Sequence, residues 1–207
     1  MKLENLSSTN KNISELLDFS IDIAKKTGEL QMKYFGDISS LKTKSTNIDL
    51  VTNADIESER LIVESISKKY PNHSIITEEK LTQEKKSNYK WIIDPLDGTT
   101  NFVHNLPIFS ISIGLMYKNT IISGVVYNPA VKKCFYATRG NGAFLNNKRI
   151  KVTSSNTLSE SLLVTGFPYT HDIYYDLSFS IFKDFYDKTQ GVRRLGAASL
   201  DLCFVAL

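Results

Sequence analysis

The feature of this sequence that most constrains the fold is a long stretch of alternating apolar residues interrupted by short turns. Within residues 109–152 the alternation is clearest in the series Phe109, Ile111, Ile113 and Leu115. Turn-forming residues break the stretch at four places, Lys118-Asn119, Asn128-Pro129, Gly140-Asn141-Gly142 and Asn146-Asn147. A period of two is typical of a half-buried strand, and such short connections join antiparallel neighbours. The stretch therefore predicts an antiparallel sheet.

Two amphipathic helices are predicted before this sheet. Apolar residues recur at helical spacing from about Ile13 to Phe35, with Ser14 as the N-cap. A second helix is predicted to begin near Thr52, which has the spacing of a capping box with Asp55, and to end before Pro71. Because helices of this kind bury one face, we expect both to pack against the sheet.

Shorter elements are predicted on both sides of the central stretch. The expected strands cover residues 74–77, 89–93, 162–165 and 192–195. A helix is predicted over 172–186, and a last one follows Gly196. The combination indicates an α/β protein of the α+β kind, layered around a mainly antiparallel sheet. Residues 1–152 are expected to form an N-terminal metal-binding lobe and 153–207 the start of a C-terminal α/β lobe, within one structural unit.

Composition and charge exclude several classes of protein. A chain of 207 residues with 42% hydrophobic and 23% charged residues is typical of a globular domain. No apolar run approaches the roughly twenty residues that span a bilayer, and residues 1–14 are polar and lack the hydrophobic stretch of a signal peptide, so a cytoplasmic location is expected. A net charge of +3 is too small to indicate direct nucleic-acid binding. Cys134 and Cys203 lie in apolar patterns and are expected in the core.

The most informative chemistry lies where a predicted strand ends in carboxylates. An apolar run leads directly into Asp94, and two residues separate it from Asp97. Pro95 biases Asp94 away from helix and Gly98 permits a tight reversal, so both carboxylates are expected in one turn. The same residues are also typical of a plain surface turn, and that alternative stays open.

These oxygen atoms favour a hard divalent cation. The carbonyl group of Leu96 lies between the two carboxylates, and Glu78 follows the preceding predicted strand. No imidazole or thiolate is near, which suits Mg²⁺ better than Zn²⁺. Converging carboxylates repel one another unless a cation keeps them ionised. Thr99-Thr100-Asn101 is expected to open a helical turn whose N–H groups face a bound phosphate.

The segment from Asp94 to Phe102 matches, without a gap, the pattern D-P-[ILV]-D-G-T-x-N-F, in which the chain resembles the inositol monophosphatase family. The resemblance extends to residues 49–52 with Asp55, to the Glu78-Glu79 pair and to residues 191–202. It implies the layered αβαβα fold of sugar phosphatases. It also implies magnesium-dependent, lithium-sensitive hydrolysis of an inositol or related sugar phosphate monoester by an activated water, without a covalent phosphoenzyme.

The resemblance also implies roles for individual residues. The residues that resemble metal ligands are Glu78, Asp94, Leu96 through its carbonyl group, and Asp97. Asp49 and Thr99 resemble the pair that positions and deprotonates the water. Substrate contacts are implied for Asp97, Gly98, Thr99, Gly196, Ala197 and Ala198. Residues 196–198 could equally serve close helix packing, and Lys42 and Lys44 could either neutralise phosphate or lie in an exposed loop.

Members of this family continue through a Trp-Asp motif that supplies a further metal ligand, whereas this chain ends at Leu207. The resemblance therefore predicts a C-terminally truncated form with weak or absent turnover. The alternative is a catalytically dead family member that binds protein partners, as some bacterial members do in transcription antitermination. Because the family is commonly dimeric, a homodimer is a further expectation.

Overall fold

The computed structural model describes residues 3–36, 41–43, 50–78, 81–167 and 173–207. The helices are α1 (Leu3–Tyr34), α2 (Asn53–Lys69), α3 (Thr99–Val103), the 3₁₀ helix η1 (Leu158–Glu160), α4 (Tyr175–Tyr186) and α5 (Ala198–Phe204). The strands are β1 (Leu41–Thr43), β2 (Leu50–Thr52), β3 (Ser74–Thr77), β4 (Tyr89–Asp97), β5 (Ser110–Tyr117), β6 (Thr120–Asn128), β7 (Lys133–Thr138), β8 (Gly142–Leu145), β9 (Lys148–Ile150), β10 (Leu162–Val164) and β11 (Gly191–Arg193).

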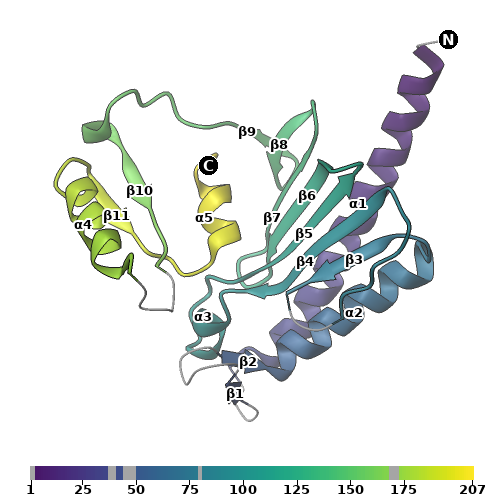
Figure 1. Ribbon diagram of the computed structural model, residues 1–207, viewed down its shortest axis with the longest axis horizontal. Coiled ribbons are helices and arrows are strands. Elements are labelled where there is room, and N and C mark those ends of the chain that lie inside the picture. The colour runs from purple at the N-terminus through teal and green to yellow at the C-terminus, as the bar shows by residue number, and fades with distance from the viewer. Residues whose placement is uncertain (1–2, 37–40, 44–49, 79–80, 168–172) are drawn as a thin grey trace.

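A seven-stranded sheet in the order β3-β4-β5-β6-β7-β8-β9 forms the centre of the fold (Figure 1). Strands β3 and β4 are parallel, and all other neighbours in this sheet are antiparallel. The predicted turns are confirmed: Asn119 (φ 62°) and Asn146 (φ 46°) take left-handed backbone conformations between their strands. Asparagine tolerates this conformation better than most residues, which is why it marks hairpins.

Helices α1 and α2 cover one face of this sheet (Figure 1). Alternate residues of β5, namely Ile111, Ile113 and Leu115, are buried in the cluster that these helices share with the sheet. Leu16 of α1 and Ile62 of α2 belong to the same cluster and are at most 2% exposed. The apolar residues that recur at helical spacing and those that alternate in the strands are therefore buried together in one core.

The opposite face carries α5. A second set of alternate strand residues, including Phe135 of β7, packs there with Ala197 and Leu200. Two small sheets stand apart from the large one: β1 and β2 pair antiparallel, and β10 and β11 pair parallel. In the view of Figure 1, α5 lies between the large sheet and the β10–β11 pair, and α4 lies beyond that pair.

The structure confirms the predicted fold class and most of the predicted elements, and it corrects two details. Helix α1 begins at Leu3, so the prediction of Ser14 as an N-cap is wrong. Ser14 lies within the helix and is exposed, where a hydroxyl group is tolerated. Strand β4 continues to Asp97, four residues past its predicted end, with an irregularity described below. The division into lobes at residue 152 stays a prediction.

Two expectations about the whole chain can be compared with the described residues. None of the helices in this part of the chain is long and apolar enough to cross a membrane. Both cysteines are free thiols. Cys134 is buried in the main cluster, and Cys203 packs against the cluster at α5. The prediction that they serve as small core residues is confirmed for Cys134, whereas Cys203 is only partly buried.

Candidate active site

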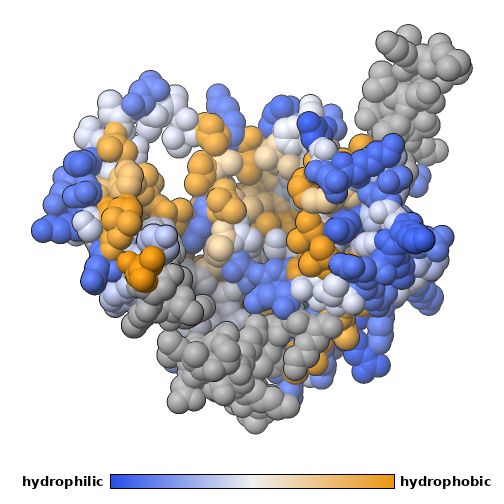
Figure 2. Space-filling model, viewed as in Figure 1, coloured by the Kyte–Doolittle hydropathy of each residue, from blue (hydrophilic) through white to orange (hydrophobic). Residues whose placement is uncertain are grey.

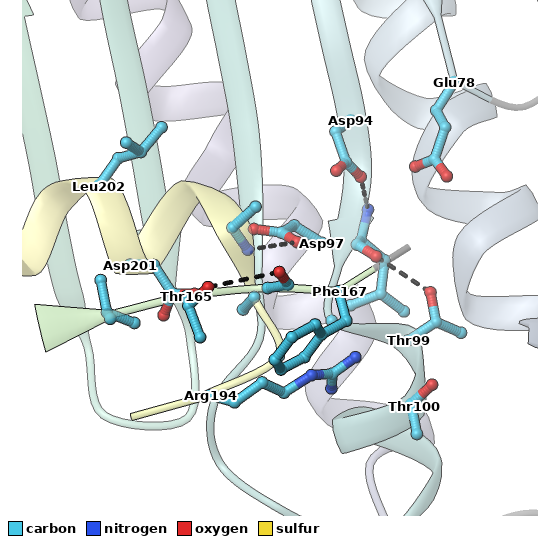
Figure 3. Close-up of a pocket in the computed structure, with 17 residues that line it drawn as sticks. Glu78, Asp94, Asp97, Thr99, Thr100, Thr165, Phe167, Arg194, Asp201 and Leu202 are labelled. Carbon is cyan, nitrogen blue, oxygen red and sulfur yellow. Dashed lines mark hydrogen bonds between the residues drawn. The ribbon is translucent and has the colours of Figure 1, made fainter. Parts of the chain in front are cut away.

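The parallel pairing of β3 and β4 places Glu78 beside Asp94. Thr77 pairs with Ile93, and the Glu78 N–H donates to the Ile93 carbonyl oxygen at 3.1 Å. Glu78 and Asp94 are the next residues along, so they leave adjacent strands at the same end of the sheet. The two side chains are close enough for Glu78 to raise the pKa of Asp94. Figure 3 shows both carboxyl groups at one edge of a pocket.

A β-bulge brings Asp97 to the same side of the strand as Asp94. Asp94 pairs with Ser112 and Asp97 pairs with Ser110, so two residues of β4 lie opposite the single residue Ile111. In a regular strand, residues three apart point to opposite faces, and one extra residue restores a common face. The turn expected from the sequence is therefore a bulge within a strand. The Leu96 N–H donates to Asp94 Oδ1 at 3.1 Å, and this bond fixes the shape of the bulge, called the acidic bulge below (Asp94–Asp97).

Burial and crowding make Asp94 difficult to ionise. The pKa of Asp94 is raised to about 9, first because the side chain is buried and then because Glu78 and Asp97 are close. Burial also raises the pKa of Asp97, although hydrogen bonds from Ser199 and Ala198 oppose this effect. Such carboxylates gain most from a nearby positive charge. Among the described residues, however, no three His, Cys, Asp or Glu side chains already lie close enough together to hold a metal ion.

The chemistry of the donor set nevertheless fits Mg²⁺. The available groups are the carboxylates of Glu78, Asp94 and Asp97 and the carbonyl oxygen of Leu96, all of them hard oxygen ligands. Histidine and cysteine side chains are absent from the pocket lining within the described residues. A divalent cation would also remove the repulsion that raises the pKa of Asp94.

Thr99 is the first residue of α3, and its side chain contacts the acidic bulge. Its hydroxyl oxygen lies 3.0 Å from Asp55 Oδ1 and 3.1 Å from the Leu96 carbonyl oxygen, and the hydroxyl donates to one of these acceptors. Asp55 belongs to α2 and is 1% exposed. The expected partner of Thr99, Asp49, lies outside the described residues, as does Lys44. Asp55 was expected in a capping box and in the family resemblance, but its contact with Thr99 was not predicted.

Asp97 links the bulge to the start of α5. Its carboxylate accepts hydrogen bonds from the Ala198 N–H at 3.1 Å, from the Ser199 N–H at 2.6 Å and from the Ser199 hydroxyl. The carboxylate therefore caps a helix that is distant in sequence, which favours its negative charge. The Ala198 N–H, expected to meet substrate, already has a partner. The substrate-binding roles of Gly196, Ala197 and Ala198 stay predictions, although all three line the pocket.

Gly98 is required where the bulge meets α5. Its φ of +92° is strained for residues with a side chain. A Cβ atom at this position would lie 2.9 Å from the Ile108 carbonyl oxygen and 3.1 Å from the Ala197 Cβ. Asn101 of α3 reinforces the same junction by donating to the carbonyl oxygens of Ile108 and Leu195, both at 2.7 Å. The pocket wall is therefore a close contact between segments about a hundred residues apart.

The pocket itself has a volume of about 490 Å³. The predicted residues Glu78, Asp94, Leu96, Asp97, Gly98 and Thr99 line it together with Gly196, Ala197 and Ala198. Residues that sequence reasoning missed complete the wall, notably Thr165, Phe167, Arg194, Asp201 and Leu202 (Figure 3). Asp201 has a buried carboxylate oxygen with no hydrogen-bond partner among the described residues. Thr165 and Phe167 carry no local signal. Arg194, Asp201 and Leu202 lie in the segment 191–202 that resembles the family, but only the fold places them at the pocket.

Fold and pocket together define a class of protein: a layered α/β protein with an acidic, oxygen-rich pocket at the ends of its sheet strands. The chain belongs to the inositol monophosphatase family, whose model matches residues 12–207. It is 43% identical over 197 residues to the Nus factor SuhB of Pasteurella multocida, covering 94% of this chain and 73% of that protein. It is 36% identical over 198 residues to human inositol monophosphatase 1, covering 93% and 72%.

Solved structures agree with this assignment. The inositol monophosphatase (IMPase) of Thermotoga maritima superposes with a TM-score of 0.84 and 37% sequence identity. The superposition covers 92% of this chain and 72% of that one. The family resemblance read from the sequence is thereby confirmed, and so is the fold that it implied.

Proposed function

We propose that this chain hydrolyses a phosphate monoester of inositol or a related sugar, with Mg²⁺ as its cofactor. The observation that carries the proposal is the position of Glu78 beside Asp94 at the pocket, where the pKa of Asp94 is raised to about 9. Glu78, Asp94 and Asp97 would hold the metal through carboxylates and Leu96 through its carbonyl group. When bound, Mg²⁺ neutralises charge on the phosphoryl oxygens and lowers the pKa of a coordinated water.

The protein's own groups would orient the reactants. The Thr99 hydroxyl directs its proton at Asp55 or at the Leu96 carbonyl group, which leaves its lone pairs free to accept a hydrogen bond from the attacking water. Asp49, by the family resemblance, would take the proton of that water. Because Gly98 has no side chain, the phosphate can approach the Gly98 and Thr99 backbone closely. The P–O bond to the sugar breaks as the water oxygen bonds to phosphorus.

The test is phosphate release from inositol 1-phosphate with and without Mg²⁺. Asp94→Asn should abolish magnesium-dependent release. Asp22→Asn is the matched control, because Asp22 lies on the exposed side of α1 in an ion pair with Lys26 and should leave activity unchanged. Asp97→Asn should also abolish release, with circular dichroism to check that α5 still forms. Release that survives in Asp94→Asn would contradict the proposal. Inhibition by lithium and a cytoplasmic location are further parts of it.

A second candidate is a protein-binding role in transcription antitermination. The similarity to the Nus factor SuhB of Pasteurella multocida favours it. The apolar side chains exposed on α4 and α5, such as Phe179 (45%) and Leu202 (76%), offer a surface for a partner or for a second copy. Capture of purified RNA polymerase by both the wild-type chain and Asp94→Asn, without phosphate release by either, would support this role. Sedimentation of the free chain tests the proposed homodimer.

A further inference from the structure

Gln31 of α1 is fully buried (0% exposed), and its side chain reaches the bulge that carries the candidate ligands. Its amide nitrogen Nε2 donates to the Pro95 carbonyl oxygen at 2.7 Å and to Ser58 Oγ of α2 at 3.2 Å. A carbonyl oxygen only accepts hydrogen bonds, so the amide nitrogen must face it. One side chain therefore ties α1, α2 and the acidic bulge together.

This arrangement is poorly suited to stability alone. Gln31 Oε1 is buried and has no hydrogen-bond partner among the described residues. An unpaired buried acceptor loses its hydration without compensation. An apolar side chain of the same length would remove that acceptor, at the cost of the donor to the Pro95 carbonyl oxygen, so the net change in stability should be small. The amide therefore contributes mainly as a constraint on Pro95.

The constraint acts on a single peptide unit. The Pro95 carbonyl group and the Leu96 N–H lie at opposite edges of one planar peptide bond. Gln31 holds the carbonyl edge, and Asp94 Oδ1 accepts a hydrogen bond from the N–H edge at 3.1 Å. Rotation of this peptide plane would turn the Asp94 carboxylate and would also redirect the Leu96 carbonyl group. Gln31 can thus control the direction of two candidate ligands without contacting the pocket.

We propose that Gln31 is a positioning residue for the candidate metal centre, acting through the Pro95–Leu96 peptide. The inference rests on the proposed function, because it assumes that Mg²⁺ binds at the bulge. It predicts that Gln31 contributes to metal affinity and loop rigidity more than to the stability of the fold.

The test compares Gln31→Met with Thr27→Val. Methionine has the same length but no donor. Thr27 is the matched control, since it lies one turn earlier on α1, is 0% exposed and has an unpartnered Oγ1, with no hydrogen bond to the bulge among the described residues. Calorimetric titration with Mg²⁺ should show a dissociation constant raised about tenfold or more in Gln31→Met, as for other residues that support metal ligands. Thr27→Val should bind like the wild type. Both variants should unfold at temperatures close to that of the wild type, because Gln31→Met loses the bond to Pro95 but also removes the unpaired Oε1.

Hydrogen exchange of the metal-free chain separates failure of this inference from failure of the proposed function. Peptides that contain Leu96 should exchange faster in Gln31→Met and unchanged in Thr27→Val. If the wild type binds no Mg²⁺, the proposed metal site is wrong, and the exchange result still decides whether Gln31 positions the loop. Equal magnesium affinity and equal exchange in Gln31→Met and the wild type would overturn the inference. Equal weakening by both variants would also overturn it, because the cause would then be packing of α1. If Gln31→Met fails to fold, Gln31→Leu takes its place.

Discussion

The two faces of the seven-stranded sheet are covered to different extents, although the same strands form both. The face of α1 and α2 is called the covered face, and the face of α5 the open face. On the face of α1 and α2, residues such as Ile113 and Leu115 are at most 1% exposed. On the other face, α5 covers only part of the sheet, and an apolar cavity of about 360 Å³ lies beside it. Figure 2 shows apolar side chains on the hollowed side of the molecule. No described residue of α4 is buried.

This difference separates the source of stability from the place of chemistry. Apolar burial stabilises a fold roughly in proportion to the area removed from water, so the face of α1 and α2 contributes most. The candidate active site opens toward the other face, where the carboxylates of β4 meet α5. A site on this face can tolerate water, strained backbone and crowded charges, which all reduce stability, because packing on the opposite face holds the strands in register.

The largest expected effect tests this asymmetry directly. Leu115→Ala on the covered face should reduce the free energy of unfolding by about 2–5 kcal/mol, because it leaves a cavity in a packed core. Leu202→Ala on the open face should change it by no more than about 0.5 kcal/mol, since Leu202 is 76% exposed. Urea denaturation followed by circular dichroism measures both. Equal losses would show that the open face is packed in solution.

Magnesium should stabilise the chain through the carboxylates at the open face. The pKa of Asp94 rises from 3.8 to about 9 on folding, so the folded state binds the proton more tightly than the unfolded state. That contribution to stability is complete below pH 4 and is lost as the pH rises toward 9. Mg²⁺ replaces the proton, so its stabilisation should be greater at pH 8 than at pH 5, reaching about 2.7 kcal/mol at 100 times the dissociation constant.

Thermal unfolding with and without MgCl₂ at the two pH values measures this effect. Asp94→Asn is the control, because its side chain keeps the shape but neither titrates nor supplies a charged ligand. A magnesium shift that is independent of pH, or that persists in Asp94→Asn, would place the ion elsewhere.

Gly98 tests the contact between the bulge and the open face. Gly98→Ala should destabilise the fold by about 1–3 kcal/mol, because it combines an unfavourable φ with contacts to Ile108 and Ala197. Gly36→Ala is matched, since Gly36 has a similar φ of +96° but nothing within 4 Å of its would-be Cβ atom. The smaller loss in Gly36→Ala isolates the cost of the backbone conformation. Equal losses in chemical denaturation would mean that the junction can separate freely.

The smallest effect concerns a polar group at the edge of the covered face. His73 Nδ1 accepts a hydrogen bond from Trp91 Nε1 at 3.1 Å. Burial, and then the charge of Lys85, lower the pKa of His73 below its ordinary 6.5. The contribution to stability is therefore present above pH 6.5 and is lost as the pH falls through the lowered pKa. The free energy of unfolding can be followed by fluorescence of the single tryptophan. The difference in this free energy between the wild type and His73→Gln should change across this pH range. A constant difference would contradict it.

Much of the fold was predictable because its signals are local. The alternation in β5 and the asparagines of its hairpins act within a few residues, so their effect does not depend on distant parts of the chain. Glu78 and Asp94 could be paired from the sequence because both follow apolar strands. The prediction for Ser14 was wrong because a serine can lie on an exposed helix surface as well as at an N-terminus.

Other features could not be read from the sequence. The hydrogen bond between Gln31 and Pro95 joins residues 64 positions apart, and that between Asp97 and Ser199 joins residues 102 positions apart. Asp55 had a sufficient local explanation as a helix-capping residue. Phe167 carries no motif, and the segment that contains Arg194 gave no sign that this side chain lines the pocket. Each of these roles depends on which segments lie side by side after folding.

The sequence by itself determined most of the secondary structure, the acidic signature of residues 94–102 and the membership of a family. It could do so because side-chain periodicity and turn chemistry act over short distances along the chain. Only the tertiary structure decided that the signature is a bulge, that α5 is capped by Asp97, and that one face of the sheet stays partly open. These outcomes depend on packing between segments that are distant in sequence.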